Sequence, residues 1–374
     1  MNFFTLHPDV YSTDDKNKLT SLPDLLDYMW NGEEIEDKDT LIFISGFSNY
    51  NGGVRFYDLF EDHINKGGKV LAYLSASANQ RLSSQQVVKE LISRGVAVTL
   101  INRKRLVHSK LYGFYSPEDD KDQGLVISSG NFTGPGMNLN VESSLLLDSS
   151  TLLNMNFSWK KVKSQIEKQN WQFYPIKGSY DIKAPYNKLL YDELKSSGRS
   201  KRDESENEYL ITTLSQNDTS RIVGRVTGGT QYIWLSKNIV GYFPPLLIRN
   251  KRGRKKTYSS EFKLSYPQLK ISGKKGRVTF EAENNMDFRF LTTNVVYRTK
   301  IAYPEDLAVI KKVADKQYEV VFISSKTKEY TQLNSYATRY IGNKGKRYGF
   351  INKETYKAIV NNHENNLSSM KIDK

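Results

Sequence analysis

The stretch Leu41-Ile-Phe-Ile-Ser-Gly-Phe47 is a short apolar run that leads into a polar, glycine-rich turn. A run of this length bounded by turn residues predicts a buried strand. Apolar residues at helical spacing follow over 56–64, and a second apolar run occupies 69–74. The pattern repeats with a helical segment over 87–92 and a third apolar run over 96–101. Strand, helix, strand, helix, strand predicts a largely parallel sheet with helices on its faces.

Three further apolar runs follow closely, at 111–115, 125–128 and 144–147, and their spacing leaves no room for helices between them. We expect these strands to join the sheet in mixed orientation. A helix is predicted over 152–171. Residues 1–175 are therefore assigned to an α/β domain, with a mixed sheet flanked by helices.

The character of the chain changes in its second half. Residues 196–208 are polar and contain no apolar side chain, which is typical of a linker or an exposed loop. Beyond them, short strand-like runs alternate with basic and glycine-bearing turns, and this pattern predicts a mainly β barrel or sandwich. We assign 176–208 to a linker and 209–374 to a basic recognition domain.

Charge is distributed unevenly between the two halves. The 374-residue chain carries a formal net charge of +14. Residues 1–200 contain 23 Lys and Arg against 24 Asp and Glu, whereas residues 201–374 contain 32 against 17. An excess of positive charge in one half indicates a polyanionic partner, for which nucleic acid is the simplest choice. A basic surface that only keeps the protein soluble is the alternative.

The composition excludes several classes of site. The chain has no cysteine and four histidines, so disulfide scaffolds, iron–sulfur sites and cysteine nucleophiles are excluded. No apolar run approaches the ~18–20 residues that a membrane helix requires, so no membrane partner is expected. The absence of cysteine fits a reducing compartment, and we expect a cytoplasmic protein.

Two common patterns of phosphate chemistry do not account for the chain. No G-x-x-x-x-G-K-[ST] loop occurs, which argues against an enzyme that binds and hydrolyses nucleoside triphosphates. Pro23-Asp24 followed by Glu36-Asp37-Lys38 formally matches a metal-dependent nuclease pattern. We interpret Pro23-Asp24 as the first turn of a helix that begins after Ser21, and 33–39 as an acidic surface turn. Neither a metal site nor another cofactor is predicted.

A more specific set of polar residues lies at the ends of the later strands. His108-Ser109-Lys110 opens one strand, Ser128-Ser129-Gly130-Asn131 ends the next, and Glu142 opens a third. Residues two apart on a strand face the same side, so His108 and Lys110 project together. The polar strand end offers hydrogen-bond donors to an anion, and Glu142 is placed to accept a bond from a histidine ring. Taken alone, His-x-Lys is also typical of a structural histidine beside a surface lysine.

Together, His108-x-Lys110, Ser129-x-Asn131-Phe-Thr and a glutamate 11 residues after the asparagine resemble the active-site signature of the phospholipase D superfamily. The strand and helix order of 41–147 is similar to that fold. In the superfamily the His-x-Lys motif usually continues to an aspartate, whereas this chain has Tyr115 at that position. That departure, with one motif copy per chain, resembles the restriction-endonuclease branch (NgoFVII/BfiI-type), whose members append a DNA-recognition domain.

The resemblance implies a mechanism and a role for each residue of the motif. His108 would attack the phosphodiester phosphorus and form a covalent phosphohistidine. Lys110 and Asn131, with Ser129, would hold the non-bridging oxygens and stabilise charge as it develops. Glu142 would orient the imidazole ring. The resemblance implies that no metal is required.

Such chemistry needs a second histidine to protonate the leaving oxygen. His7, His63 and His363 are not followed by x-Lys, so the second motif must come from another subunit. We therefore predict a homodimer formed through the N-terminal domain, with one composite active site across its two-fold axis. A single site of this kind would cut a duplex by sequential strand nicks.

The basic half supplies candidate DNA contacts. Residues 251–256 carry five positive charges in six residues, and tyrosine and tryptophan are interleaved nearby. Basic loops between strands can straddle phosphates while neighbouring side chains reach the major groove, although a solvated turn is the alternative. By family resemblance the fold would be a B-three-like pseudobarrel. The candidate DNA-binding residues are Arg221, Arg225, Lys251, Arg252, Arg254, Lys255, Lys256, Lys274, Lys275 and Arg277.

The sequence thus predicts a metal-independent, site-specific endonuclease of double-stranded DNA that serves as one arm of a restriction–modification system. One alternative is a nonspecific nuclease or phosphodiesterase of the same superfamily. Another is a non-catalytic DNA-binding protein on that scaffold, against which the intact set of motif residues argues. Some relatives work with a separate ATP-dependent translocase subunit, and the sequence leaves that partner open.

Overall fold

The computed structural model divides the chain into two compact units. Unit 1 comprises Met1–Lys195 and Asn238–Pro245, and unit 2 comprises Ser196–Lys237 and Leu246–Lys374. Within the described residues, no helix is long and apolar enough to cross a membrane. The structure describes residues 1–7, 10–16, 18–32, 35–37, 39–118, 122–195, 208–219, 232–252, 255–281, 288–292, 299–341 and 345–369.

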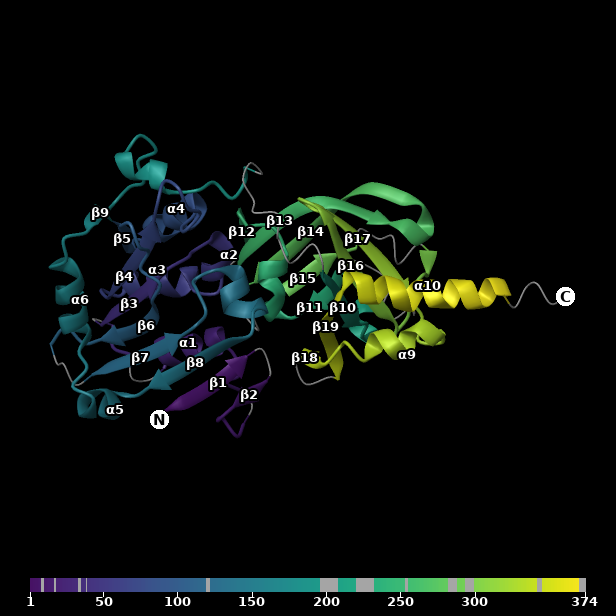
Figure 1. The fold of residues 1–374 in the computed structure, drawn as a ribbon, viewed down its shortest axis with the longest axis horizontal. Helices are drawn as coiled ribbons and strands as arrows, with labels where there is room; N and C mark the ends of the chain where they lie inside the picture. Colours follow the sequence, from purple (N-terminus) through teal and green to yellow (C-terminus); the bar gives the residue numbers. More distant parts are fainter. Residues whose placement is uncertain are drawn as a thin grey trace. The chain divides into compact units, whose positions relative to one another are not determined.

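Unit 1 is built on a nine-stranded sheet with the order β2-β1-β8-β7-β6-β3-β4-β5-β9 (Figure 1). Its strands are β1 (Phe3–His7), β2 (Tyr11–Ser12), β3 (Thr40–Ser45), β4 (Lys69–Ala76), β5 (Ala97–Asn102), β6 (Lys110–Tyr115), β7 (Gln123–Ser128), β8 (Glu142–Leu147) and β9 (Gln172–Ile176). Its helices are α1 (Leu22–Trp30), α2 (Tyr50–Gly53), α3 (Tyr57–Asn65), α4 (Gln85–Ser93), α5 (Ser149–Asn154) and α6 (Trp159–Glu167), with helical turns at η1 (Pro135–Leu139) and η2 (Pro185–Leu189).

Among the strands described in unit 1, only the adjacent strands β3, β4 and β5 pair in parallel, because these are the strands that long helical segments connect. The other pairings among the described residues of unit 1 are antiparallel, as short connections between β6, β7 and β8 require. The expectation of a largely parallel sheet is therefore wrong, whereas the mixed sheet flanked by helices is confirmed.

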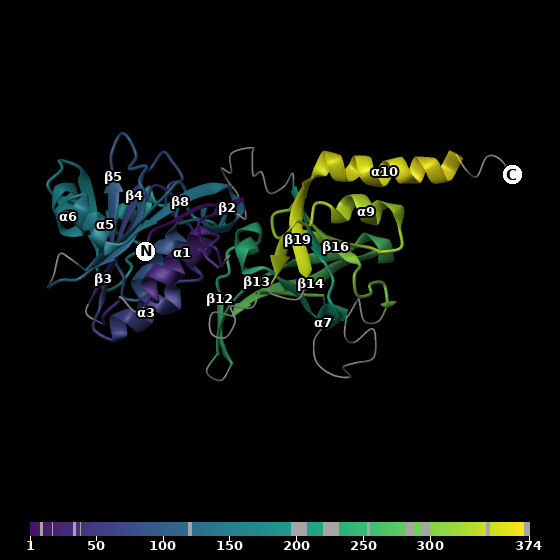
Figure 2. The same ribbon diagram turned by 90° about the horizontal axis from the view of Figure 1, so that it is seen from below.

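Helices cover both faces of this sheet (Figure 2). A buried tryptophan anchors the helices on each face. On one face Trp30 of α1 packs edge-on to Phe60 of α3, and its indole nitrogen donates to the Gly113 carbonyl at 3.1 Å. On the other face Trp159 of α6 packs with Ile42 and Ile44, and its indole nitrogen donates to the Gly124 carbonyl. A tryptophan that satisfies its N–H in this way can be buried without an unpaired donor.

The helix starts follow local capping chemistry. Ser21 accepts a hydrogen bond from the Asp24 backbone N–H at the start of α1, and Ser84 does the same for Val87 at the start of α4. The Asp24 carboxylate also pairs with Arg55 at 3.0 Å. The capping interpretation of Pro23-Asp24 is therefore confirmed, since both residues lie in the first turn of α1.

The boundary predicted for unit 1 is too short. Residues 176–195, which the sequence assigned to a linker, lie within unit 1, where Tyr186 and Leu189 are buried. Two polar anchors hold this segment, because Glu193 accepts from the Tyr50 backbone N–H at 2.8 Å and from the Ser84 hydroxyl. Contacts between distant parts of the chain thus order a segment whose composition indicated a linker.

Unit 2 contains a ten-stranded sheet with the order β11-β15-β14-β13-β17-β16-β10-β19-β18, and β12 pairs with β13 beside this path. Its strands are β10 (Glu208–Thr213), β11 (Tyr232–Leu235), β12 (Ile248–Arg252), β13 (Lys255–Tyr266), β14 (Ile271–Glu281), β15 (Phe288–Leu291), β16 (Leu307–Ala314), β17 (Gln317–Ile323), β18 (Arg339–Ile341) and β19 (Lys346–Asn352). Its helices are α7 (Gln216–Thr219), α9 (Lys328–Asn334) and α10 (Lys353–Ser369), with a turn at η5 (Pro267–Leu269), whereas nearly all of the turn η4 (Lys237–Tyr242) belongs to unit 1.

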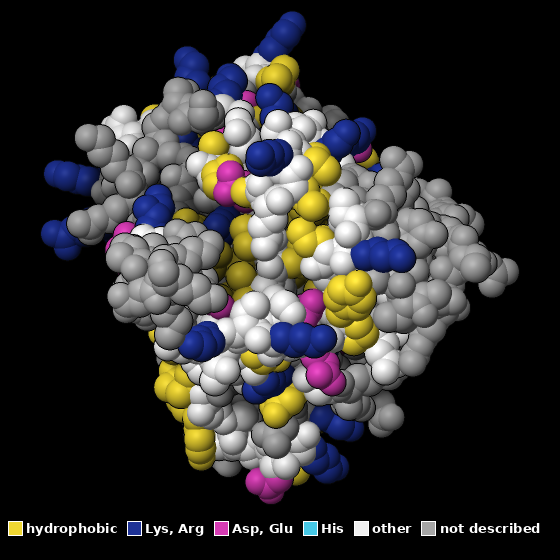
Figure 3. Space-filling view, turned by 90° about the vertical axis from the view of Figure 1, so that its right-hand side faces the viewer, with side chains coloured by type: hydrophobic (Ala, Val, Ile, Leu, Met, Phe, Trp, Pro, Cys, Tyr) yellow, Lys and Arg dark blue, Asp and Glu magenta, His cyan; other side chains and the backbone are white. Residues whose placement is uncertain are grey.

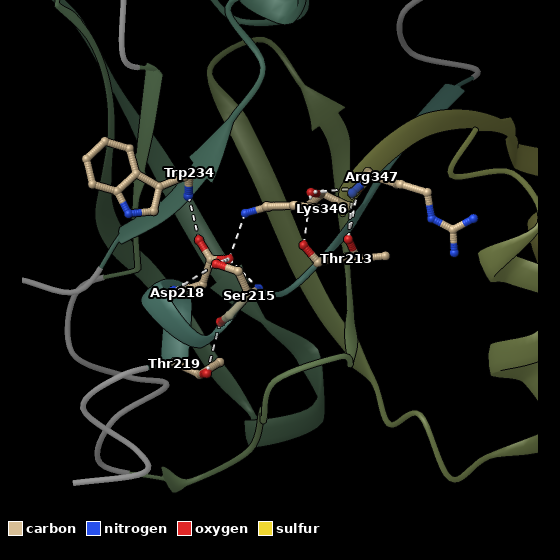
Figure 4. A network of polar contacts seen from close by, with 8 residues as sticks. Thr213, Ser215, Asp218, Thr219, Trp234, Lys346 and Arg347 are labelled. Carbon is tan, nitrogen blue, oxygen red and sulfur yellow. Dashed lines mark hydrogen bonds and ion pairs between the residues drawn. The ribbon is translucent and has the colours of Figure 1, made fainter. Parts of the chain in front are cut away.

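Strands near opposite ends of this sheet are joined by one buried carboxylate. Asp218 of α7 accepts from the Trp234 backbone N–H in β11 at 2.8 Å and from Lys346 Nζ in β19 at 2.7 Å (Figure 4). Asp218 and Lys346 are both buried, and Ser215 contributes two further donors to the same carboxylate. The sheet therefore curls into a barrel-like form, and the predicted mainly β pseudobarrel is confirmed.

Candidate active site

The strand register brings the predicted motif residues to one edge of the unit 1 sheet. Ser45, the last residue of β3, is paired with Lys110, the first residue of β6. Ser128, the last residue of β7, is paired with Ser144 near the start of β8. Because β3 and β7 end where β6 and β8 begin, the residues just beyond these ends, including Gly46 and Asn131, meet at the same edge.

His108 and Lys110 are in direct contact. Lys110 Nζ lies 2.8 Å from His108 Nε2 and donates to the His108 carbonyl at 3.0 Å. The His108 ring is exposed and meets Phe47 edge-on, whereas Lys110 is only 7% exposed. Burial lowers the pKa of Lys110, and the negative charge of Glu142 opposes that shift. A protonated Lys110 that donates to Nε2 requires the histidine N–H to be on Nδ1, and it places a positive charge beside Nε2.

Asn131 is held with its amide nitrogen available to a ligand. Its side-chain oxygen accepts from the Phe47 backbone N–H at 3.1 Å, and Nδ2 has no partner among the described residues. Gly46 allows the chain to pass close to this site, because a Cβ there would lie 3.0 Å from the Val107 carbonyl oxygen, in tight contact. Histidine, lysine and asparagine therefore converge on a small exposed site with two kinds of donor.

Ser129 and Glu142 differ from the expectation. The Ser129 hydroxyl donates to Glu142 Oε2 and accepts from the Ser143 backbone N–H at 3.1 Å, so its one proton is already used. The other Glu142 oxygen accepts from Asn140 Nδ2 at 3.1 Å. No hydrogen bond joins Glu142 to the His108 ring within the described residues.

Within a single chain, Ser129 and Glu142 therefore do not make the contacts that the resemblance implies for them. Ser129 does not present its proton to a phosphate oxygen, because it lies beside Ser143 of β8 and is captured by the neighbouring carboxylate. Glu142 is fixed by Ser129 and Asn140 and acts on Lys110 through its charge. The sequence analysis did not predict a role for Asn140. Its position two residues before Glu142 was the feature that could have indicated it.

The remaining described histidines do not supply a second imidazole to this site. His7 lies opposite Glu142 in the β1–β8 register but is fully buried, and its Nε2 accepts from the Leu22 backbone N–H at 3.4 Å. Burial lowers the pKa of His7 to about 4, so it is neutral near pH 7 and a poor proton donor. His63 lies on α3, with Nε2 2.8 Å from the Asp39 carbonyl. The side chain of His363 lies outside the described residues.

No cluster of three or more potential metal ligands occurs among the described residues. Asp24 lies in the first turn of α1 and is paired with Arg55. The Glu36 backbone N–H donates to the Asp39 carboxylate.

The candidate DNA-binding residues fall on the β12–β13–β14 hairpins of unit 2. Lys251 is paired with Lys256 and Arg252 with Lys255 in the β12–β13 register, although the side chains of Lys251, Arg252 and Lys255 are not described. Lys274 and Lys275 are exposed, and Lys275 pairs with Glu261 at 2.8 Å. Figure 3 shows Lys and Arg side chains projecting around one face of the chain. The predicted residues Arg221, Arg225 and Arg254 lie outside the described residues.

Three solved structures share partial likeness with the chain. They are Nuc, a phospholipase D family member from Salmonella typhimurium (10% identity, TM-score 0.25, covering 39% of this chain and 87% of that one), the N-terminal domain of Helicobacter pylori LlaJI.R1 (13%, 0.23, 38% and 97%), and phosphatidylserine synthase from Haemophilus influenzae (14%, 0.29, 47% and 40%). TM-scores of this size do not by themselves establish a shared fold.

A family comparison is more informative for unit 2. No curated protein sequence matches the chain. Residues 202–362 match the family described as the DNA-binding domain of the metal-independent restriction enzyme BfiI. The predicted resemblance to BfiI-type restriction endonucleases is thereby confirmed through the recognition domain, which is similar in sequence to the DNA-binding domain of such an enzyme.

Proposed function

We propose that this protein is a metal-independent, site-specific endonuclease of double-stranded DNA that works as a homodimer with one composite active site. The observation that carries the proposal is the contact between His108 Nε2 and Lys110 Nζ beside the Asn131 amide. The match of residues 202–362 to a restriction-enzyme DNA-binding domain supports DNA as the substrate.

The chemistry follows from the donors that converge on His108. Nε2 attacks the phosphorus, the bond to the leaving oxygen breaks, and a phosphohistidine forms. Lys110 and the Asn131 amide nitrogen stabilise the charge that develops on the non-bridging oxygens. A second imidazolium protonates the leaving oxygen, and the resulting imidazole then takes a proton from the water that hydrolyses the phosphohistidine. Glu142 keeps Lys110 charged and, in the assembled dimer, is proposed to orient the imidazole.

The second imidazolium is proposed to come from a second copy of the chain. Of the described histidines, His7 and His63 are buried, and His108 alone is exposed. A row of apolar side chains crosses four strands at the same end of the sheet, formed by Leu111, Ile127, Leu145 and Phe4. Ile127 is 41% exposed, and Val141, which directly precedes β8, is 61% exposed. A second copy that covers this row would bury apolar surface next to His108.

Cleavage of plasmid DNA in EDTA tests the catalytic proposal. The wild-type chain is expected to produce discrete fragments, and His108→Ala is expected to bind the same DNA without cutting it. Ser109→Ala is the matched control, because Ser109 is exposed between the two motif residues and should leave cleavage intact. A smear of products would indicate a nonspecific nuclease, and undiminished cleavage by His108→Ala would contradict the mechanism.

Sedimentation of the full chain tests the dimer. Ile127→Asp places a charge in the apolar row and should weaken self-association at least about 10-fold, with a parallel loss of cleavage. Ile182→Asp is the control, since Ile182 is 63% exposed elsewhere on unit 1. A fully active monomer at the concentrations of the cleavage assay would rule out the composite site.

A further inference from the structure

The sheet edge that carries the candidate active site of unit 1 extends well beyond His108. At this edge β3, β4, β5 and β7 end and β6 and β8 begin, and we call it the active edge. The loop 103–109 runs along it from the end of β5 to the start of β6. On the way, Val107 and Ser75 of β4 are joined by hydrogen bonds of 2.9 and 3.1 Å. The loop 77–84 lies at the same edge, beside the loop that follows β3.

The loops of the active edge differ in charge from two loops at the opposite edge of the sheet. The loops at the active edge contain four Lys and Arg residues and no Asp or Glu; these loops are 46–49, 77–84, 103–109 and 129–134. At the opposite edge, the described residues of 31–39 and 116–122 include no Lys or Arg, and their acidic residues are Glu36, Asp37, Asp39, Glu118 and Asp122. The active edge is therefore basic, although the first 200 residues are almost neutral as a whole.

Arg103 is held by an aromatic ring, and its charged group is not used within the unit. Its Cζ lies 4.5 Å from the centre of the Trp171 ring. Trp171 directly precedes β9, whose first residue, Gln172, accepts from Asn102 Nδ2 at 2.7 Å. Arg103 is half-buried, and among the described residues its guanidinium makes neither an ion pair nor a hydrogen bond. The ring restricts the orientation of the guanidinium, and its N–H donors remain available to an external anion.

Arg81 has a similar arrangement in the neighbouring loop. Its Cζ lies 4.5 Å from the centre of the Tyr191 ring, and its side chain is half-buried. The Tyr191 backbone N–H donates to the Ser83 carbonyl at 3.2 Å, which fixes the ring beside this loop. The charge of Arg81 opposes the rise in the pKa of Glu193, so this guanidinium also acts within the unit. Arg103 is therefore the better placed of the two to bind a partner.

The spacing of these cations fits a strand of phosphates better than a single anion. In the sheet order β6-β3-β4-β5, three strand spacings separate the start of β6 at Lys110 from the end of β5 next to Arg103. At ~4.8 Å for each spacing this distance is ~14 Å, about four phosphates along one strand of a duplex. The loop of Arg81 follows β4 and is bonded to the loop after β3, so it lies between these two positions. Lys110, Arg81 and Arg103 thus form a line of cations along the active edge.

On the other side of His108 the active edge leads to a different surface. Beyond β6 lie β7, β8 and β1, where Ile127 and Val141 are exposed apolar side chains. That surface is the one proposed to be covered by a second copy of the chain. The line of cations therefore leads away from the shared site within each chain, and a two-fold axis would continue it in the second copy.

We infer that Arg103 and Arg81 bind phosphates of the DNA strand that is cut, and so align the scissile bond with His108. This inference rests on the proposed function and deepens it, because it assigns substrate binding in unit 1 to residues outside the motif and outside the predicted DNA-binding set. Trp171 and Tyr191 are positioning residues, since they orient the two guanidinium groups. In the proposed dimer the strand is held in this way on both sides of the cut.

Cleavage of duplexes that carry one neutral linkage tests the inference. The cut position of wild type is mapped first, and a methylphosphonate linkage is then placed at each nearby phosphate in turn. Enzyme is in saturating excess, so the single-turnover rate reports alignment of the bond and not binding by unit 2. We expect a neutral linkage about four phosphates from the cut to slow wild type about 10-fold. Arg103→Gln should slow cleavage of the natural duplex to a similar degree and should lose its sensitivity to that linkage.

Two further variants separate a directed phosphate contact from a general loss of charge. Arg105→Gln removes a charge from the same loop, but Arg105 is exposed and contacts no ring or carboxylate among the described residues. This variant should cleave within about 3-fold of wild type and keep the sensitivity to the neutral linkage. Trp171→Leu should lose part of that sensitivity, because Arg103 keeps its charge without the ring that orients it. Thermal unfolding shows whether each variant is folded.

The outcomes separate this inference from the proposed function. Additive losses from Arg103→Gln and the neutral linkage would overturn the inference and leave a cleaving enzyme. An equal loss in Arg105→Gln would indicate general charge attraction and would also overturn the inference. Absence of any cleavage by wild type would overturn the proposed function together with this inference.

Discussion

Each unit of this protein buries a lysine at the start of a strand, and the two lysines differ in what they contact. Lys346 opens β19, is 6% exposed and donates to the buried Asp218 carboxylate at 2.7 Å. Lys110 opens β6, is 7% exposed and contacts His108, with no ion pair to a carboxylate among the described residues. Burial lowers the pKa of both ammonium groups.

The charge of Lys346 therefore stabilises the fold, whereas we propose that the charge of Lys110 acts in the reaction. The charge of Lys346 is neutralised within the fold, where it helps Asp218 to join β11 to β19. The charge of Lys110 is left to act on the exposed edge of the sheet, beside a nucleophilic nitrogen. An incompletely paired buried cation at an exposed site is what the stabilisation of a developing phosphate charge requires. The variants below test this comparison.

The largest effect is expected for Lys110→Met. Removal of the ammonium group should lower the single-turnover cleavage rate about 1,000-fold, because charge that develops on the phosphate oxygens is no longer stabilised. DNA affinity, measured by fluorescence anisotropy, should stay within about 3-fold of wild type, since binding is assigned to unit 2. Lys104→Met is the matched control, because Lys104 is exposed in the preceding loop. An equal loss in both variants would contradict the role of Lys110.

Disruption of the Lys346–Asp218 pair should, in contrast, affect the stability of unit 2. Asp218→Asn leaves the Lys346 charge buried and unpaired and should lower the free energy of unfolding of unit 2 by about 3–5 kcal/mol. The double variant Asp218→Asn/Lys346→Met should recover part of that loss, because no charge then remains buried. Hydrogen exchange measured by mass spectrometry separates the two units, and a loss of protection confined to unit 1 would refute the assignment.

A pH-dependent difference is expected within unit 1. Glu193 is half-buried between α2 and α4, and burial of its carboxyl group raises its pKa to about 7. The folded state therefore keeps a proton that the unfolded state releases above its ordinary pKa near 4.5, so this group makes stability fall as pH rises from about 4.5 to 7. Glu193→Gln should gain up to about 3 kcal/mol relative to wild type between pH 4.5 and 8. Denaturant unfolding of wild type and Glu193→Gln at several pH values measures the difference in unfolding free energy. If this free energy depended on pH in the same way in both proteins, the prediction would be contradicted.

The smallest effect concerns the helix starts of the two units. Ser21 caps α1 by accepting from Asp24 N–H, whereas Thr327 at the start of α9 makes no side-chain cap and bonds back to the Ser324 carbonyl. Ser21→Ala should cost about 1 kcal/mol of unfolding free energy, and Thr327→Ala only a few tenths. Chemical denaturation of both variants tests this contrast. Equal losses of unfolding free energy in the two variants would contradict it.

Much of unit 1 could be predicted because its signals are local. The apolar run at 41–47 marks β3, and the serine that precedes Pro23-Asp24 marks the start of α1. Strand directions were harder, since they depend on which strands pair in the sheet. The segment 176–195 lies in unit 1 and not in the predicted linker, and the sequence did not reveal this because Tyr50 and Ser84, the partners of Glu193, are distant along the chain.

The sequence alone determined which chemical groups the protein can use. It supplies one His-x-Lys, an asparagine beyond the next strand and a basic second half, and their resemblance to the phospholipase D signature is what predicts phosphodiester chemistry on a polyanion. Only the tertiary structure decided how these groups are engaged, because hydrogen bonds between neighbouring strands join residues that the sequence separates. In the tertiary structure the Ser129 hydroxyl donates to Glu142, and the Asn131 amide nitrogen remains available. The tertiary structure also places the Arg289 guanidinium close to the rings of Tyr232 and Trp234.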